Sequence, residues 1–107
     1  MSQHFFRTAT AAGIPVEVML GWDRPLGRFF MVVETTEQAA SETDNILYSN
    51  LTDPEDAALD LAYFRNKLKA LGINGPESMF VEAELDGRTN AGNRRILHRG
   101  DGRFEPM

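Results

Sequence analysis

The chain has 107 residues, a net charge of −5, no cysteine and an apolar fraction of 42%. These values suit one domain, residues 1–107, whose core needs neither disulfides nor a metal, and they exclude a thiol nucleophile. The acidic balance disfavours a surface that follows nucleic-acid backbone. We expect a cytoplasmic protein without a membrane segment, because its apolar runs are much shorter than the roughly 20 residues that cross a bilayer.

Charge is distributed unevenly along the chain. Residues 1–87 hold 6 basic and 14 acidic side chains, a net −8, whereas residues 88–107 hold 5 basic and 2 acidic side chains, a net +3. Two interpretations follow from this asymmetry. Either the basic part packs on the acidic body and neutralises some of its charge, or it forms a rim that binds an anion.

The first third of the chain alternates as β-strands do, and strands are predicted at 4–10, 15–22 and 27–34. Between the last two, Asp23, Pro25 and Gly27 have the composition of a tight hairpin turn. The strand at 27–34 is apolar on both faces. That pattern indicates a central strand that is covered on both sides or lies at an interface.

A short strand is predicted at 46–51, followed by a long helix at 54–71. Asp53 is the expected N-cap, and Gly72 is expected to end the helix. The stripe expected to face the sheet comprises Ala57, Leu61, Phe64, Leu68 and Leu71.

The opposite side of this helix is less polar than a solvent-exposed face should be. Leu59, Tyr63 and Ala70 lie there. Either another part of the same chain covers them, or a second chain does.

The segment 76–86 fits either a strand or a helix, and we favour a short helix because Pro76 suits a first helical position. A short strand is predicted at 94–99, and residues 100–107 are expected to form a turn and a frayed tail. The resulting fold class is α+β. It comprises an antiparallel meander of three to four strands, a long and a short helix on one face, and a short C-terminal strand.

Polar side chains gather between residues 86 and 98. An enzyme interpretation makes His98 or Asp86 a general base and uses Asn93, Arg94 and Arg95 to hold an anionic metabolite or nucleotide. A structural interpretation explains the same residues by turn formation and strand alternation. Nucleotide-binding and hydrolase motifs are absent, and the two histidines are too far apart in sequence to indicate a metal site, so we expect neither a metal nor another cofactor.

The leading hypothesis is a non-catalytic module that self-associates or binds another protein. Trp and Arg are frequent at the centres of protein interfaces, and an apolar residue at a hairpin tip is a natural contact. The candidate contact residues are Trp22, Arg24, Leu26, Leu59 and Tyr63. The alternative is a small-ligand enzyme or sensor that uses segment 86–98.

Three stretches, GWDRPLGRFFMVVE, LYSNLTDP and TNAGNRRILH, carry a resemblance that covers about half of the chain. In these stretches the chain resembles a family of short uncharacterised bacterial proteins with no assigned activity. The resemblance implies a bacterial origin and assigns no catalytic residue.

Overall fold

The computed structural model describes residues 1–36, 45–53 and 60–107. Its strands are β1 (Ser2–Ala9), β2 (Pro15–Asp23), β3 (Arg28–Thr35), β4 (Ile46–Ser49), β5 (Arg94–His98) and β6 (Phe104–Pro106). Its helices are α1 (Leu61–Ala70) and α2 (Glu77–Thr89), and a 3₁₀ turn at Asn50–Thr52 follows β4.

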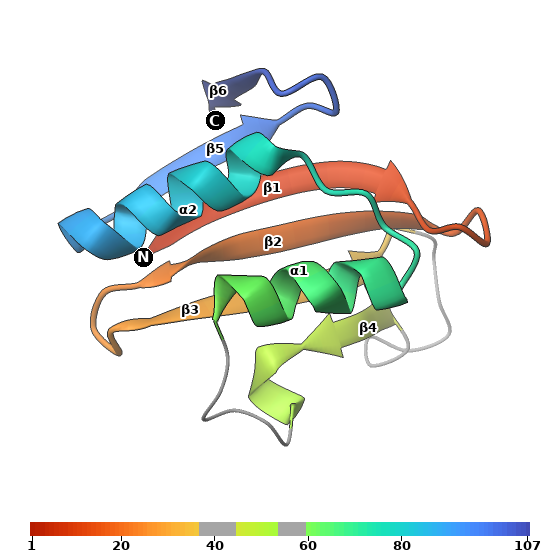
Figure 1. Cartoon of the computed structure of the whole chain (residues 1–107), viewed down its shortest axis with the longest axis horizontal. Helices are drawn as coiled ribbons and strands as arrows, with labels where there is room; N and C mark the ends of the chain where they lie inside the picture. Colours follow the sequence, from red (N-terminus) through yellow and green to blue (C-terminus); the bar gives the residue numbers. More distant parts are fainter. Residues whose placement is uncertain (37–44, 54–59) are drawn as a thin grey trace.

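The strands form one mixed sheet in the order β4-β3-β2-β1-β5-β6 (Figure 1). The expected α+β class is confirmed, but the expected antiparallel meander is wrong in one respect. β5 does not continue the antiparallel meander after β4; it joins the opposite edge, where it pairs in parallel with β1, and β6 then adds to β5. The first and the last parts of the described chain are therefore neighbours in the sheet.

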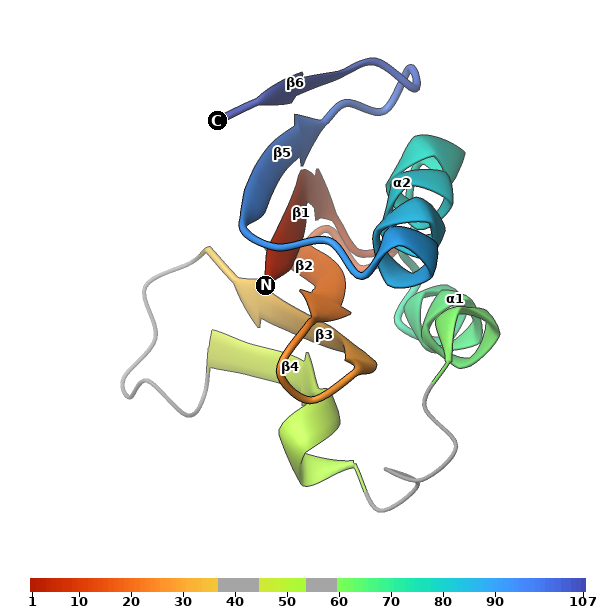
Figure 2. The same ribbon diagram turned by 90° about the vertical axis from the view of Figure 1, so that its left-hand side faces the viewer.

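Both helices pack on the same face of the sheet (Figure 2). The hydrophobic core lies between the two layers, and α2 rests on β1 and β2. Of the stripe that was expected to face the sheet, Phe64 and Leu68 are buried in the core, Leu61 and Leu71 are partly buried against it, and Ala57 lies outside the described residues. The other core residues are mainly those of β1, β2, β3 and α2: Phe6, Val16, Val18, Leu20, Met31, Val33, Met79, Phe80 and Ala83.

The hairpin between β2 and β3 has the predicted turn chemistry. Gly27 adopts a positive φ of 62°, and its N–H donates to the main-chain oxygen of Asp23 at 2.7 Å. The side chain of Asp23 accepts a further hydrogen bond from the N–H of Leu26. The turn thus needs no ligand to explain its sequence.

Within the described residues, the N-cap of α1 is Asp60 rather than the expected Asp53. The Asp60 carboxylate accepts a hydrogen bond from the N–H of Tyr63 at 2.7 Å. Asp53 instead accepts hydrogen bonds from the hydroxyl groups of Tyr48 and Tyr63. Residues 54–59, which were predicted to start the helix, lie outside the described part of the chain, and so does Leu59.

Segment 76–86 is a helix, as predicted, and it extends to Thr89. Pro76 precedes its first turn, and Asn90 ends it in the left-handed conformation with a φ of 51°. The tail at 100–107 differs from the prediction, because its residues 104–106 pair with β5 as β6. Among the described residues, no helix has the length and hydropathy needed to cross a bilayer.

Candidate active site

Three segments that are far apart in the sequence bring polar side chains into one row. In α2, Ser78, Glu82 and Asp86 follow each other at intervals of four residues, so they share one side of the helix. β1 and β5 are parallel neighbours, and His4 and His98 project from the side of these strands that faces the helix. Pairing of β1 with β5 under α2 therefore assembles the row.

The row is a continuous series of hydrogen bonds, here called the polar chain, from Ser78 through His98 and His4 to Asp86. Oγ of Ser78 lies 2.9 Å from Nδ1 of His98, and Nε2 of His98 lies 2.8 Å from Nδ1 of His4. Nε2 of His4 lies 2.6 Å from Oδ2 of Asp86. The imidazoles and the carboxylate are at most 2% exposed, so water hardly competes for these bonds.

The carboxylate end of the polar chain is well supplied with donors. Nη1 of Arg94 donates to Oδ1 of Asp86 at 2.8 Å, and Nη2 of Arg94 donates to Oε1 of Glu82 at 2.6 Å. The buried hydroxyl of Ser2 also donates to Asp86, while its oxygen accepts the N–H of Trp22 at 3.0 Å. These donors, together with the adjacent imidazole, offset the cost of burying a negative charge.

The partners determine the direction of every bond in the polar chain. Arg94 can only donate, so Asp86 accepts from it, and an ionised Asp86 also requires a proton on Nε2 of His4. Nδ1 of a neutral His4 is then an acceptor, so Nε2 of His98 carries a proton. Nδ1 of His98 keeps its lone pair and accepts the hydroxyl proton of Ser78. The Ser78 hydroxyl therefore donates to an imidazole nitrogen, as the nucleophile does in a serine hydrolase.

The electrostatics of the site agree with this assignment. Burial, and next the charge that a protonated His4 would carry, lowers the pKa of His98 to about 4. Burial also lowers the pKa of His4, although the hydrogen bond with Asp86 opposes this effect. Burial alone would raise the pKa of Asp86, but hydrogen bonds from His4, Ser2 and Arg94 bring it below its usual value. At neutral pH the polar chain thus holds an ionised carboxylate and two neutral imidazoles.

Ser78 is half-buried and lies in the first turn of α2, where main-chain N–H groups have no partner within the helix. A hollow of about 290 Å³ borders His98 at the C-terminal ends of β1 and β5. The ring of Phe104 packs on His98, with 5.2 Å between the ring centroids. Besides His98, the lining of the hollow is mixed: Phe6 and Leu97 are apolar, and Arg7 and Arg99 are charged.

The two imidazoles do not resemble a metal site. All four ring nitrogens already have hydrogen-bond partners within the polar chain. In the part of the chain that the structure describes, no group of three or more His, Asp or Glu side chains could hold a metal ion.

The structure separates the residues that were expected to bind an anion. His98 belongs to the polar chain, and Arg94 donates to the carboxylate at its end. Arg94 already binds two carboxylates, however. Asn93 accepts a hydrogen bond from the N-terminal amine at 3.0 Å. Arg95 projects from the other face of the sheet, with its guanidinium 5.4 Å from the ring centre of Phe5. The four residues therefore do not converge on one point.

The expected partner contacts are also dispersed. Trp22 packs edge-on against Phe29, and its indole N–H donates to Asn90 at 3.1 Å. Tyr63 packs against the core and donates to Asp53. At Tyr63, this side of α1 is therefore covered by the same chain, which was one of the two alternatives. Arg24 and Leu26 are exposed at the hairpin, and Leu26 is 68% exposed.

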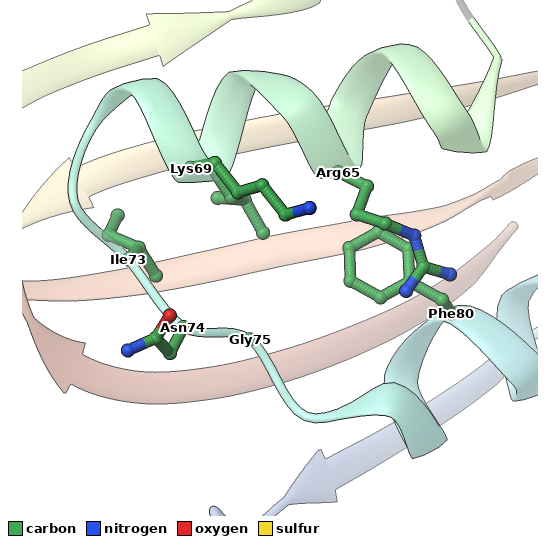
Figure 3. A pocket seen from close by; sticks show the side chains of 7 residues that line it. Arg65, Lys69, Ile73, Asn74, Gly75 and Phe80 are labelled. Atoms are coloured by element: carbon green, nitrogen blue, oxygen red, sulfur yellow. The ribbon is translucent and has the colours of Figure 1, made fainter.

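A cleft of about 150 Å³ lies between the end of α1 and the start of α2 (Figure 3). Arg65 and Lys69 make it basic, which would suit an anion. However, the guanidinium of Arg65 stacks on Phe80, 4.4 Å from its ring centre, and forms a two-pronged ion pair with Glu77. Glu77 already supplies the negative charge, so this arrangement fastens the two helices together.

Sequence analysis identified His98, Asp86 and Arg94 but missed His4, Ser78 and Ser2. The missed residues lie outside the polar segment and reach it only through strand pairing and helix packing. One signal was present in the sequence: Ser78, Glu82 and Asp86 recur every four residues on one side of a helix. No protein-family model, curated protein or solved structure matches the chain. Function is therefore inferred from the geometry of the site.

Proposed function

We propose that the protein is an enzyme of acyl transfer in which Ser78 is the nucleophile and the polar chain is its base. One observation carries the proposal: the Ser78 hydroxyl donates to an unprotonated imidazole nitrogen, and that imidazole is hydrogen-bonded through a second one to a buried carboxylate. A hydroxyl with an oriented base is the arrangement that activates serine.

The polar chain supports a balanced reaction on a carboxylic ester. As Oγ of Ser78 attacks the carbonyl carbon, its proton moves to Nδ1 of His98, and the proton on Nε2 of His98 moves to Nδ1 of His4. The positive charge then resides on His4, beside the carboxylate of Asp86. The return of both protons protonates the departing alcohol and leaves an acyl group on Ser78. Water then attacks this ester by the same proton path, which releases the acid and restores the hydroxyl.

The imidazole of His4 compensates for the weak basicity of His98. A pKa of about 4 makes His98 a weak base by itself, because burial opposes its positive charge. Transfer of the second proton to His4 places the charge next to Asp86 instead. The low pKa of His98 describes a positive charge on His98 itself. The relay moves that charge to His4, so the low pKa of His98 does not oppose the reaction.

The surroundings favour a small substrate. The hollow is about 290 Å³, just below the lower limit of roughly 300 Å³ for ligand sites, and it is lined by His98 rather than by Ser78 itself. The cations at its rim already have carboxylate partners: Arg7 pairs with Glu17, and Arg99 with Glu105. We therefore expect a short, uncharged ester rather than an anionic one.

Labelling with a fluorophosphonate tests this proposal, because that probe reacts with activated serines. We expect a single adduct at pH 8, located on Ser78 by peptide mass spectrometry. Ser78→Ala should abolish the adduct and lower hydrolysis of a p-nitrophenyl acetate panel by at least about 10³-fold. His98→Gln should abolish labelling while Ser78 remains present.

Arg88→Gln is the matched control, since Arg88 is on the solvent side of the same helix, paired with Glu84. It should label like the wild type. Circular dichroism would establish that each variant is folded. An unlabelled Ser78 in the folded wild type, or equal labelling of His98→Gln, would show that the polar chain only holds α2 on the sheet.

A further inference from the structure

The face of the sheet opposite α1 and α2, here called the outer face, has no helix over it among the described residues (Figure 2). β3 was expected to be apolar on both sides, and it is: Phe29, Met31 and Val33 face the helices, and Phe30 and Val32 face outward. A surface of this kind is an interface candidate.

An apolar row crosses the middle of the outer face. Met19 pairs with Val32 on one side and with Phe5 on the other, and Phe5 pairs with Leu97. Four adjacent strands, β3, β2, β1 and β5, thus contribute one apolar side chain each.

An apolar hollow lies beside this row. It measures about 410 Å³, and its lining includes Met19, Phe30 and Val32 together with Leu26 and Leu51. Leu26 and Leu51 are 68% and 84% exposed. The hairpin tip that was singled out as a partner contact therefore extends the outer face.

A charged row runs parallel to the apolar one, two residues further along the strands. Glu17 pairs with Glu34 of β3 and with Arg7 of β1. Arg99 follows the pair of Phe6 and His98, so alternation places it next to Arg7. The row is acidic on β3 and β2 and basic on β1 and beyond β5.

This division of charge is self-complementary under a two-fold rotation. We propose that a second copy of this chain docks on the outer face, about an axis parallel to the strands and between β1 and β2. The rotation places β2 of one subunit over β1 of the other and β3 over β5. Each row of side chains then faces the same row of the partner subunit. It places Glu17 opposite Arg7 of the partner subunit and Glu34 opposite Arg99 of the partner subunit. A patch that complements itself is the requirement for a two-fold dimer.

The apolar rows superpose under the same operation. Val32 lies opposite Leu97 of the partner subunit, and Met19 lies opposite Phe5 of the partner subunit. The sheet is spread across the two longer dimensions of the molecule, 38 and 32 Å (Figure 1), so a typical contact of about 800 Å² per subunit fits on this face. Face-to-face packing of two sheets is a common architecture.

The charged row alone is unfavourable within one subunit. Glu17 and Glu34 are directly paired like charges, which destabilises a sheet. Glu17 has Arg7 at 2.8 Å, whereas Glu34 is exposed and forms no ion pair within the described residues. Arg99 pairs with Glu105 within its own subunit, so Arg99 of the partner subunit would gain Glu34 as a second carboxylate partner.

Sedimentation equilibrium of the full chain tests the proposal. We expect a monomer–dimer equilibrium that Leu97→Asp shifts to monomer, with a dissociation constant raised at least about 100-fold. Val81→Asp is the matched control, because Val81 is 53% exposed on α2, across the molecule from the outer face. It should leave the dimer unchanged.

Charge reversal tests the axis. Glu34→Arg should weaken the dimer about tenfold at low salt, and adding Arg99→Glu should restore it. The chain has no cysteine, so a mixture of Glu34→Cys and Arg99→Cys proteins can be oxidised without interference. We expect mixed 34–99 disulfides to exceed 34–34 and 99–99 disulfides.

Several results would overturn the proposal. One is a wild-type protein that stays monomeric at a concentration of about 1 mM, which corresponds to less than about 4 kcal/mol of association free energy. Another is a dimer that Val81→Asp disrupts and Leu97→Asp does not. A dimer without preferred 34–99 disulfides would refute the axis.

Discussion

The carboxylate of Asp86 joins three parts of the chain. It accepts hydrogen bonds from Ser2 and His4 of β1 and from Arg94 of β5, while α2 carries it. A buried charge with this many donors is stable only as long as all of them stay in place.

We predict that Asp86→Asn lowers the free energy of unfolding by about 3 kcal/mol, because the change leaves the imidazole and guanidinium donors without a buried negative charge. Urea denaturation measures this difference. Glu84→Gln, on the exposed side of α2 beside Arg88, should cost less than about 0.5 kcal/mol. A cost below about 1 kcal/mol for Asp86→Asn would contradict the assigned charge state.

The sequence supports part of the site at the level of single residues. His98, Arg94 and Asp86 are close together in the chain, so their common chemistry could be recognised. His4 is 94 positions from His98 and meets it only because β1 and β5 pair in parallel. No local pattern indicates that pairing, which is why Ser2 and His4 were missed, whereas Ser78 could have been found from its four-residue spacing to Glu82 and Asp86.

At the scale of elements, two glycines allow close packing. Gly87 of α2 lies against Phe29, and a Cβ there would be 2.7 Å from the ring. Gly21 of β2 is more tightly enclosed, because a Cβ there would lie 2.0 Å from the main-chain oxygen of Ser2. The start of β1 can approach β2 because this side chain is absent.

Gly21→Ala should therefore destabilise the protein by about 2 kcal/mol or more, since the atom it meets belongs to the backbone and cannot rotate away. Thermal or urea denaturation would measure the loss. Gly100→Ala is the control, because a Cβ added at Gly100 would have no atom within 4 Å, and it should change stability by less than about 0.5 kcal/mol. Equal effects of the two changes would refute this explanation.

Most elements were predictable because their signals are local. The hairpin turn at Asp23 to Gly27 and the helix after Pro76 follow from turn and capping chemistry. The cap of α1 was assigned to Asp53 because Pro54, which suits a first helical position, follows it. Two tyrosine hydroxyls occupy Asp53, a tertiary effect that capping rules do not include.

At the scale of the whole molecule, the α+β class followed from the pattern of strands and helices, but the sheet order did not. After two helices, β5 can join either edge of a sheet. It joins β1, where His98 and Ile96 find buried positions, and β6 then pairs with it. The tail was expected to fray because it follows a turn at residues 100–102, but its residues 104–106 form an exposed strand that pairs with β5.

The buried histidines make the whole fold sensitive to acid. The pKa of His98 is about 4 in the folded chain, against an ordinary value of 6.5 for an exposed histidine, so between these values the unfolded state binds more protons. The stability that this group contributes is fully present above pH 6.5 and falls as the pH decreases towards 4, by about 3 kcal/mol in total.

Urea denaturation at pH values of about 7.5, 5.5 and 4.5 should show this decline. The chain has two histidines, so their imidazole Cε1–H signals can be followed individually by NMR. The ring of His98 should not titrate between about pH 8 and 5, and the pKa of His4 should lie below the ordinary histidine value because of its burial. A titration midpoint near the ordinary histidine value for either ring would disprove its burial as a neutral group.

The parallel pairing of β1 with β5 also has a consequence for biosynthesis. On the ribosome, His4 is synthesised 94 residues before its hydrogen-bond partner His98. A nascent or truncated polypeptide that ends before residue 94 cannot complete the proton relay, so the relay would form only after β5 has been synthesised.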